Sequence, residues 1–330
     1  MPQSRIHLHV ENLHALGRVF EADRKRVREA LARRPALQGM VRTSIGYDGD
    51  ILEKRLKTAD VVFAWDIPRH DLARRAPRLK WMHAHGAGVN HLMPLDWLPP
   101  GAVLTNSRGV HGRRATEYAS MAILMLNNRV PEMVTNQRKG RWRQCFNSNI
   151  GGKTLLIVGV GHIGGAVAKW AKGMDMHVIG VRRSGRRHRH ADEMHTPDKL
   201  SALLPRADFV LMSAPHTGES HHMIGAKELA RMKKGAGLVN YSRANCVDYD
   251  ALVDKLERGE MSAVLDVFDP EPLPKRSPLW KAPNVIITPH CSSDDSDYYT
   301  PRTLDLVLEN VERHLAGKTL RNRVRPELQY

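Results

Sequence analysis

The sequence has little cysteine and no long apolar run. Its three cysteines, Cys145, Cys246 and Cys291, are widely spaced and form no CxxC pair. They suit neither a disulfide framework nor a zinc site, so no metal is expected. No stretch approaches the roughly 18 apolar residues that span a bilayer, and the amino terminus lacks the apolar core of a signal peptide. We therefore expect a cytoplasmic protein without a membrane partner.

Acidic residues are also scarce relative to basic ones. The 330 residues contain 51 Lys and Arg against 35 Asp and Glu, for a net charge of +16. Such an excess raises the question of a polyanionic partner. The basic residues are scattered along the chain, however, and the one dense stretch, residues 182–190, has no aromatic residue for base stacking. We interpret most of the charge as a solvated surface and do not expect nucleic acid as a partner.

Short apolar runs alternate with helical patterns in the first third of the chain. This alternation predicts a parallel sheet covered by helices on both faces. The expected strands are residues 5–10, 40–45, 60–65 and 79–84, and the expected helices are residues 21–34 and 48–59.

A second and stronger series of strands follows a helical pattern at about 111–139, which Pro131 should interrupt. Six strands in this rhythm form a doubly wound sheet on their own. A final helix is expected at 295–317 and should return to the first unit, because its apolar residues share one face. The expected strands are 154–159, 177–181, 208–213, 237–242, 262–267 and 284–289, with helices at 162–173 and 248–258.

A glycine-rich turn, "GVGHIGG", joins the first strand of this series to a helix. Gly159, Gly161 and Gly164 have GxGxxG spacing. The first glycine allows the tight turn, the second lets the backbone approach a pyrophosphate, and the third lets helix and strand pack closely. The helix start, at His162 and Ile163, offers N–H groups to the phosphates. This context predicts a dinucleotide site.

The fold class that follows is α/β, with two Rossmann-like or flavodoxin-like parallel-sheet domains. We expect the dinucleotide-binding domain, residues 106–292, to be inserted into a substrate domain formed by residues 1–105 and 293–330.

The second strand of the dinucleotide-binding series ends in arginine instead of an acid. In NAD sites a carboxylate at this point bonds the ribose 2′-hydroxyl. Here Arg182, Arg183 and Ser184 follow the strand, and no acid appears until Asp192. Two arginines favour a 2′-phosphate, and each charge-assisted hydrogen bond contributes about 1.5–3 kcal/mol. The prediction is NADP(H) in preference to NAD(H). The alternative is a solvated loop, with NAD(H) as cofactor.

Three polar residues follow later strands, at the sheet edge where ligands bind in open α/β sheets. They are Arg243, Glu271 and His290. Each is unremarkable alone, because arginines and histidines after strands are commonly surface or structural residues.

In combination with "GVGHIGG", the sequence resembles the D-isomer-specific 2-hydroxyacid dehydrogenase family, and within it the glyoxylate/hydroxypyruvate reductases. The similarity includes "GAGVNHL", "LTNSRGVHG", "SAPHTGESHHMI" and "HLAGKTLRNRV", and covers nearly the whole chain. The family also contains phosphoglycerate dehydrogenases. This chain departs from the family pattern after Arg243, where Ala244 replaces a usual glycine, and after His290, where "CSSDDSDYY" follows. These departures leave the identity of the substrate open.

The resemblance implies roles for individual residues. Arg243 would bind the substrate carboxylate and carbonyl, His290 would be the acid–base, and Glu271 would pair with His290. The substrate carboxylate would also bind backbone N–H groups at Ala87 and Gly88. Asp266 would lie near the nicotinamide amide, its alternative role being to bond a neighbouring loop. The residues that would line the cofactor groove are Ala214, Pro215 and Ser242.

Physical chemistry fits these roles. Reduction of a 2-oxo acid needs a hydride on the carbonyl carbon and a proton on its oxygen, and histidine is a suitable proton donor. A neighbouring carboxylate stabilises the imidazolium, and a guanidinium matches a carboxylate bidentately.

The sequence therefore predicts an NADPH-dependent reductase of small 2-oxo acids that forms D-2-hydroxy acids. The alternatives are an NAD-linked D-2-hydroxyacid or phosphoglycerate-type dehydrogenase, and a non-enzymatic dinucleotide-sensing regulator that resembles corepressors. A homodimer is expected, with a subunit contact on the apolar helix within 112–130. Trp65 and Trp142 are expected in core or interface packing, with a contribution to the pocket as the alternative.

Overall fold

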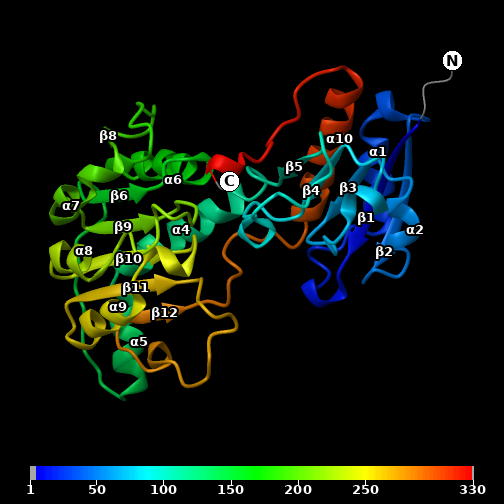
Figure 1. Ribbon diagram of the computed structural model, residues 1–330. Coiled ribbons are helices and arrows are strands. Elements are labelled where there is room, and N and C mark those ends of the chain that lie inside the picture. The colour runs from blue at the N-terminus through cyan, green and yellow to red at the C-terminus, as the bar shows by residue number, and fades with distance from the viewer. Residues whose placement is uncertain (1–4, 329–330) are drawn as a thin grey trace. The chain divides into compact units, whose positions relative to one another are not determined.

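The computed structural model describes residues 5–328 and divides the chain into two compact units. Unit 1 contains the residues up to 111 and those from 294 onward, and unit 2 contains residues 112–293. In Figure 1 the strands of unit 1 run from blue to cyan, and those of unit 2 from green to orange. Within residues 5–328, no helix combines the length and the hydropathy needed to cross a membrane.

Unit 1 is built on a five-stranded parallel sheet with the order β2-β1-β3-β4-β5. This is the flavodoxin-like order, which confirms the predicted class. Strand β5 was not predicted, because its polar Thr105 and Asn106 mask the strand pattern. The strands are β1 (Ile6–Asn12), β2 (Val41–Tyr47), β3 (Val61–Ala64), β4 (Trp81–Ala84) and β5 (Val103–Asn106).

The C-terminal helix α10 (Tyr299–Leu315) packs on this sheet. Its apolar residues Leu304, Val307 and Leu308 share a core with Phe63 and Trp81. The helix therefore completes the core of unit 1, although the whole of unit 2 lies between the helix and the strands of unit 1 along the chain. The other helices of unit 1 are α1 (Arg24–Ala32), α2 (Leu52–Leu56) and α3 (Leu72–Arg75).

Unit 2 contains a seven-stranded parallel sheet with the order β12-β11-β10-β9-β6-β7-β8. Six of these strands were predicted. The edge strand β8 was missed, because its three residues are only half-buried and carry no apolar alternation. The strands are β6 (Thr154–Val158), β7 (His177–Val181), β8 (Glu193–His195), β9 (Phe209–Met212), β10 (Ala236–Asn240), β11 (Met261–Leu265) and β12 (Val285–Ile287).

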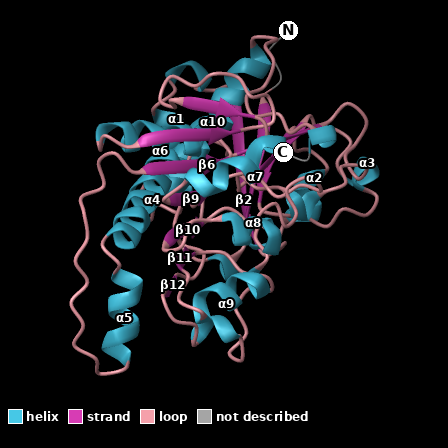
Figure 2. Ribbon diagram, turned by 90° about the vertical axis from the view of Figure 1, so that its left-hand side faces the viewer, coloured by secondary structure: helices cyan, strands magenta, loops and turns pink. Residues whose placement is uncertain are grey.

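The predicted long helix of unit 2 is interrupted, and Figure 2 shows α4 and α5 as separate helices. Arg129 has a left-handed backbone with φ of 55°, and Pro131 lies in the first turn of α5, where proline is tolerated. A long loop without helix or strand follows α5. The helices are α4 (Gly112–Asn127), α5 (Val130–Arg138), α6 (His162–Gly173), α7 (Leu200–Leu203), α8 (Ala226–Arg231) and α9 (Tyr249–Glu257).

The strand order of unit 2 reverses between β6 and β9. From β6 the chain continues outward to β7 and β8, and it then returns to β9 on the other side of β6. Ligands of open α/β sheets bind at such a switch point, outside the carboxyl ends of the strands. Two cores cover the faces of this sheet, one packed with α7, α8 and α9 and the other with α4 and α6.

Candidate active site

The glycine-rich turn lies at the switch point, after β6. Gly159 has φ of 105°, and a Cβ on it would lie 2.4 Å from the backbone nitrogen of Ala214, just after β9. A Cβ on Gly164 would lie 2.3 Å from the carbonyl oxygen of Gly159. A Cβ on Gly161, in contrast, would meet nothing within 4 Å. Two glycines are thus required by close packing, and the third faces open space where a ligand can approach.

The start of helix α6 is equipped for a pyrophosphate. No side chain caps it at Gly161. Among the described residues, no acceptor bonds the backbone N–H groups of His162, Ile163 and Gly164. Free N–H groups at a helix start attract anions through hydrogen bonding and the helix dipole. The residues present therefore fit the phosphates of a dinucleotide.

The basic stretch 182–190 folds back on itself after β7. The Arg182 guanidinium donates to the carbonyl oxygens of Arg186 and Arg187, the latter at 2.8 Å. The backbone N–H of Arg186 donates to the Ser184 hydroxyl at 3.4 Å. Further along, the His188 ring lies where a Cβ on Gly165 of α6 would be, with its Nε2 2.7 Å from that point. The stretch is thus anchored beside the start of α6.

One acid reaches the predicted 2′-phosphate site, and sequence reasoning missed it. Glu219, in the loop after β9, lies 3.0 Å from the guanidinium of Arg183. The sequence feature that could have identified Glu219 is its position in "SAPHTGES", the segment that follows β9, the strand beside β6. Asp192, the first acid after β7 along the chain, is used elsewhere, because it accepts a bond from the backbone N–H of Val178 at the beginning of β7.

His290 and Glu271 form a hydrogen-bonded pair at the carboxyl end of the sheet. Nδ1 of His290 lies 2.7 Å from Glu271 Oε2, and the other carboxylate oxygen accepts from the backbone N–H of Phe268 at 2.8 Å. The carboxylate is therefore oriented by the chain, and it selects the tautomer with a proton on Nδ1. Both side chains are partly exposed, and the other ring nitrogen, Nε2, remains for a reaction partner.

Asp266 is fully buried and holds the loop that carries His290. Its carboxylate accepts from the Thr288 hydroxyl at 2.5 Å and from the backbone N–H groups of Cys291 and Ser292, each at 3.1 Å. The Thr288 hydroxyl lies in turn 2.7 Å from that of Tyr118. His290 has φ of 49°, a conformation uncommon outside glycine. These bonds on both sides hold that conformation, so Asp266 does bond the neighbouring loop. Its position near the nicotinamide amide stays a prediction.

Arg243 follows β10 and is half-buried. Its guanidinium donates to the Ser242 carbonyl at 2.6 Å, and the Ser242 hydroxyl donates to Asn240 at 3.1 Å. Burial lowers the pKa of Arg243, while Cys246 and Glu271 act in the opposite direction. The ordinary pKa of arginine is so high that the group stays a cation. The neighbouring loop is also ordered, because Ser220 donates to the carbonyl of Pro215 at 2.8 Å.

The predicted carboxylate-binding loop belongs to unit 1 and follows β4. The Asn106 side chain donates to the Ala87 carbonyl at 2.8 Å. No described residue accepts from the backbone N–H groups of Ala87 and Gly88. Trp65 covers this loop, because a Cβ on Gly86 would lie 3.0 Å from its ring. The loop thus offers two N–H donors beside an aromatic wall, and Trp65 is a half-buried residue of this site.

Some of the predicted site residues contact one another in the structure, and the others are divided between the two units. Within unit 2, Glu271 contacts His290 directly and acts electrostatically on Arg243. Ala87 and Gly88 belong to unit 1. Much of the apolar side of α4 is buried in the core of unit 2, whereas its Met121 is 40% exposed. The predicted subunit contact on this helix stays a prediction.

A glycine-rich turn at the switch point of a doubly wound sheet defines a dinucleotide-binding α/β protein. The sequence model of the "D-isomer specific 2-hydroxyacid dehydrogenase, NAD binding domain" matches residues 120–292. The chain belongs to the D-isomer-specific 2-hydroxyacid dehydrogenase family, whose members are NAD(P)-dependent oxidoreductases.

Individual relatives are similar over most of the chain. A glyoxylate reductase of Korarchaeum cryptofilum is 32% identical over 290 residues, which cover 84% of this chain and 86% of the relative. A D-isomer-specific 2-hydroxyacid dehydrogenase of Xanthobacter autotrophicus, solved with NADPH and MES, has a TM-score of 0.84 at 28% identity and covers 99% of this chain and 100% of its own. An NADPH-dependent glyoxylate/hydroxypyruvate reductase of Sinorhizobium meliloti, solved with NADP and sulfate, has a TM-score of 0.80 at 25% identity, with coverage of 98% and 100%.

Proposed function

We propose that this protein reduces small 2-oxo acids such as glyoxylate and hydroxypyruvate to 2-hydroxy acids, with NADPH as the reductant. Where the product is chiral, as glycerate is, the D-isomer is expected. The observation that carries the proposal is the His290–Glu271 pair, 2.7 Å apart, at the same sheet edge as the half-buried Arg243. A proton donor and a cation for a carboxylate are the two groups that this reaction needs from the protein. The names of the reductase relatives favour the same substrates.

Arg243 and the loop at Ala87 and Gly88 are the proposed substrate-binding groups. The guanidinium offers a planar fork to the carboxylate, and it stabilises negative charge that grows on the carbonyl oxygen. The two free backbone N–H groups of the loop bond the carboxylate in the same way as a nest of amides binds other anions. Neither interaction requires a metal ion.

His290 is the proposed proton donor. A bound reduced nicotinamide supplies the hydride. Addition of that hydride to the carbonyl carbon leaves an alkoxide, and Nε2–H of His290 donates its proton to the oxygen. Glu271, bonded to Nδ1, stabilises the imidazolium before the transfer and keeps the ring oriented after it. Asp266 acts through the loop, as a positioning residue.

Arg182, Arg183 and Ser184 support the proposed preference for NADPH. A 2′-phosphate at the end of β7 would meet two guanidinium groups, and the acid Glu219 is already paired with Arg183. The remaining cofactor contacts are proposed for the residues after β6, β9 and β10. They are Gly159, Gly161, His162, Ile163, Gly164, Ala214, Pro215 and Ser242.

A second copy of the chain is the proposed partner, and the long loop after α5 supports it. Trp142 is 96% exposed and Phe146 is 82% exposed. Met121 and Met133 add two further exposed apolar side chains in unit 2. Large aromatic side chains in water are typical of interaction surfaces. Trp142 is therefore not a core residue of the single chain, and this exposure supports the interface role over a contribution to the pocket. Light scattering of wild type and Trp142→Ser/Phe146→Ser tests it, with a dimer expected only for the wild type.

Product analysis tests the reaction itself. Purified protein incubated with NADPH and hydroxypyruvate should form D-glycerate in an amount equal to the NADPH consumed. Formation of the L-isomer would contradict the proposed D-specificity. Absence of turnover with both glyoxylate and hydroxypyruvate would move the proposal to other 2-oxo acids, and absence of turnover with any of them would favour a dinucleotide-sensing regulator.

A further inference from the structure

A pocket of about 850 Å³ lies in unit 1, at the amino ends of strands β4 and β5. Trp81 and Val103, the first residues of these strands, line it together with the turn that follows α10. The candidate substrate loop at Ala87 follows the opposite end of β4. A four-residue strand spans about 10 Å between its end residues. The pocket is therefore separate from the substrate loop.

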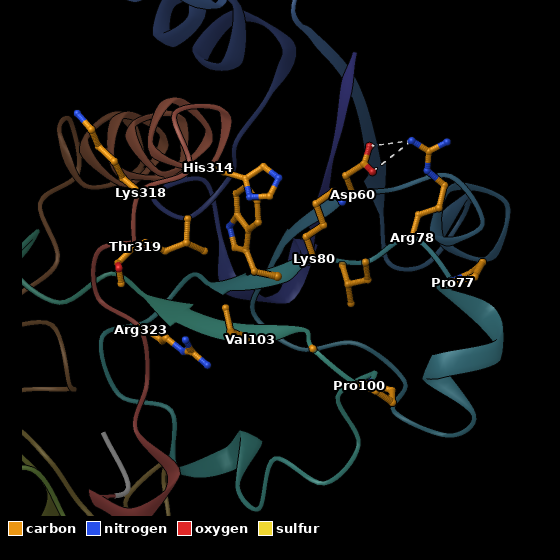
Figure 3. Close-up of a pocket in the computed structure, with 15 residues that line it drawn as sticks. Asp60, Pro77, Arg78, Lys80, Pro100, Val103, His314, Lys318, Thr319 and Arg323 are labelled. Atoms are coloured by element: carbon orange, nitrogen blue, oxygen red, sulfur yellow. Dashed lines mark hydrogen bonds and ion pairs between the residues drawn. The ribbon is translucent and has the colours of Figure 1, made fainter. Parts of the chain in front are cut away.

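The charged side chains around this pocket are almost all basic, as Figure 3 shows. Among the described residues that line it, the single carboxylate is that of Asp60, which is buried. It accepts from the backbone N–H of His7 at 2.9 Å and from the Arg78 guanidinium at 3.3 Å. The Asp60 carboxylate thus already has hydrogen-bond partners, and it does not pair with the other basic side chains of the pocket. The basic residues that line the pocket are Arg78, Lys80, His314, Lys318 and Arg323.

Three of these cations, Lys80, Lys318 and Arg323, form no ion pair with any residue of the described chain. Their mutual repulsion is unfavourable, and a bound anion would relieve it. The positive charge acts on His314. The pKa of His314 is lowered mainly by burial and next by Lys80, whereas Asp60 raises it. The pocket is therefore a concave surface of positive electrostatic potential, to which at least three cations contribute.

A buried donor without an acceptor lies in the same wall. Trp81 is fully buried, and its indole Nε1–H has no acceptor among residues 5–328. Its ring contacts that of His314, with 5.3 Å between the centroids. Buried polar groups are nearly always hydrogen-bonded in native proteins. An orphaned N–H beside a basic pocket favours an anionic ligand, because an anionic oxygen would supply the missing acceptor.

We propose that this pocket binds a small organic anion with at least two negative charges, of the phosphomonoester or polycarboxylate class. Three uncompensated cations match a dianion or a trianion. Pro77, Leu79 and Pro100 supply apolar walls for a carbon skeleton. A nucleic acid is disfavoured, because the aromatic residue of the pocket is buried and offers no stacking surface.

Calorimetric titration of the wild-type protein at low ionic strength tests the proposal. The probes are citrate, glycerol 2-phosphate and, as a monovalent control, acetate. We expect one site per chain for citrate or for glycerol 2-phosphate, with acetate at least about tenfold weaker, since attraction scales with ligand charge. The stronger of the two probes identifies the class. Equal affinity for all three anions, or no binding, would overturn the proposal.

Variants locate the site. Lys80→Ala/Lys318→Ala removes two exposed cations of the pocket, and the control Arg28→Ala/Lys57→Ala removes two exposed cations elsewhere in unit 1. The pocket variant should lose at least about tenfold in affinity and the control less than about twofold. Arg323→Ala is a second pocket variant, in case the first folds poorly.

Two further results would contradict the assignment. Equal losses in the pocket variant and its control would mean diffuse charge attraction without a site. Binding that survives in the pocket variant but is lost in Arg243→Ala would belong to the candidate active site. Because the readout is binding without dinucleotide, failure of this proposal is distinguishable from failure of the proposed reductase activity.

Discussion

Two segments of unit 2 follow strands of the same sheet, but their charged groups are held very differently. The loop around His290 is bonded to a fully buried carboxylate, that of Asp266, and His290 itself is paired with Glu271. The stretch 182–190 is largely exposed, and Arg182 donates to the carbonyls of its own loop. The first segment is held by a buried carboxylate and by a direct side-chain pair. The bonds of the second segment include those of Arg182 to backbone carbonyls of its own loop and the exposed Arg183–Glu219 pair.

This difference matches the two functions proposed for the segments, which are proton transfer and selection of the cofactor. Proton transfer depends on atoms held in place, because small errors in position are costly. Selection between NADPH and NADH depends on the net attraction for one phosphate, which exposed arginines provide without a rigid frame. Substitutions in the first segment should therefore change turnover, and those in the second should change cofactor preference. The following predictions test that separation.

The largest effect is expected for His290→Ala. Loss of a general acid typically costs two to four orders of magnitude, so we expect kcat to fall about a thousandfold. Binding of NADPH, followed by its fluorescence, should remain within about twofold of wild type. If turnover stayed within about threefold, the proton donor would have to be another group.

Glu271→Gln keeps a hydrogen-bond acceptor but removes the charge beside His290. Because the imidazolium loses its counter-charge, kcat should fall about 10- to 100-fold. The KM for hydroxypyruvate should change less than kcat. Glu257→Gln, an exposed residue on α9, is the matched control and should behave as wild type. A kcat equal to that of the control would show that the pair is only structural.

Thr288 tests whether the buried network positions His290. Thr288→Val removes the hydroxyl that bonds Asp266 and Tyr118, so we expect kcat to fall about tenfold with an unchanged KM for NADPH. Thr288→Ser restores the hydroxyl and should recover most of the loss. A uniform change in both parameters, without rescue by serine, would indicate a general loss of stability instead.

Arg182→Asp should shift preference toward NADH. Replacing a cation by an anion beside a 2′-phosphate changes the ratio of kcat/KM for NADPH to that for NADH about 10- to 100-fold, with little change in kcat. Arg187→Asp makes the same change of charge at an exposed position of the same stretch. Equal effects of the two substitutions would mean a solvated loop without a defined phosphate site.

The smallest effect is expected for Glu219→Gln. The Arg183–Glu219 pair is exposed, and such pairs are worth only about 0.2–1 kcal/mol. Releasing Arg183 should therefore lower the KM for NADPH about two- to fivefold while the KM for NADH stays constant. A lower KM for both cofactors would show that Glu219 acts on the loop in general.

Much of the fold was predictable because its signals are local. Alternating strands and helices, the glycine spacing and Pro131 identify both sheets and the break between α4 and α5. Strands β5 and β8 were missed, because short strands with polar residues have no distinctive period.

The candidate site was predictable only in part, for a different reason. His290 and Glu271 bond each other in the segments that follow two neighbouring strands, and both lie in recognisable sequence motifs. Glu219 and Thr288 act through partners 36 and 22 residues away in the sequence. Contacts of this kind depend on which strands become neighbours, and a linear pattern does not contain that information. The exposure of Trp142 is likewise a property of the folded chain.

The most direct test of the account is kcat/KM for hydroxypyruvate and glyoxylate, each measured with NADPH and with NADH on the wild-type protein. The account predicts fast turnover of at least one substrate and a clear preference for NADPH, because an organised proton donor and an arginine pair occur together. Fast turnover with a preference for NADH would retain the reductase but contradict the role of Arg182 and Arg183. No turnover with either cofactor would contradict the assignment of His290 as the proton donor to these substrates.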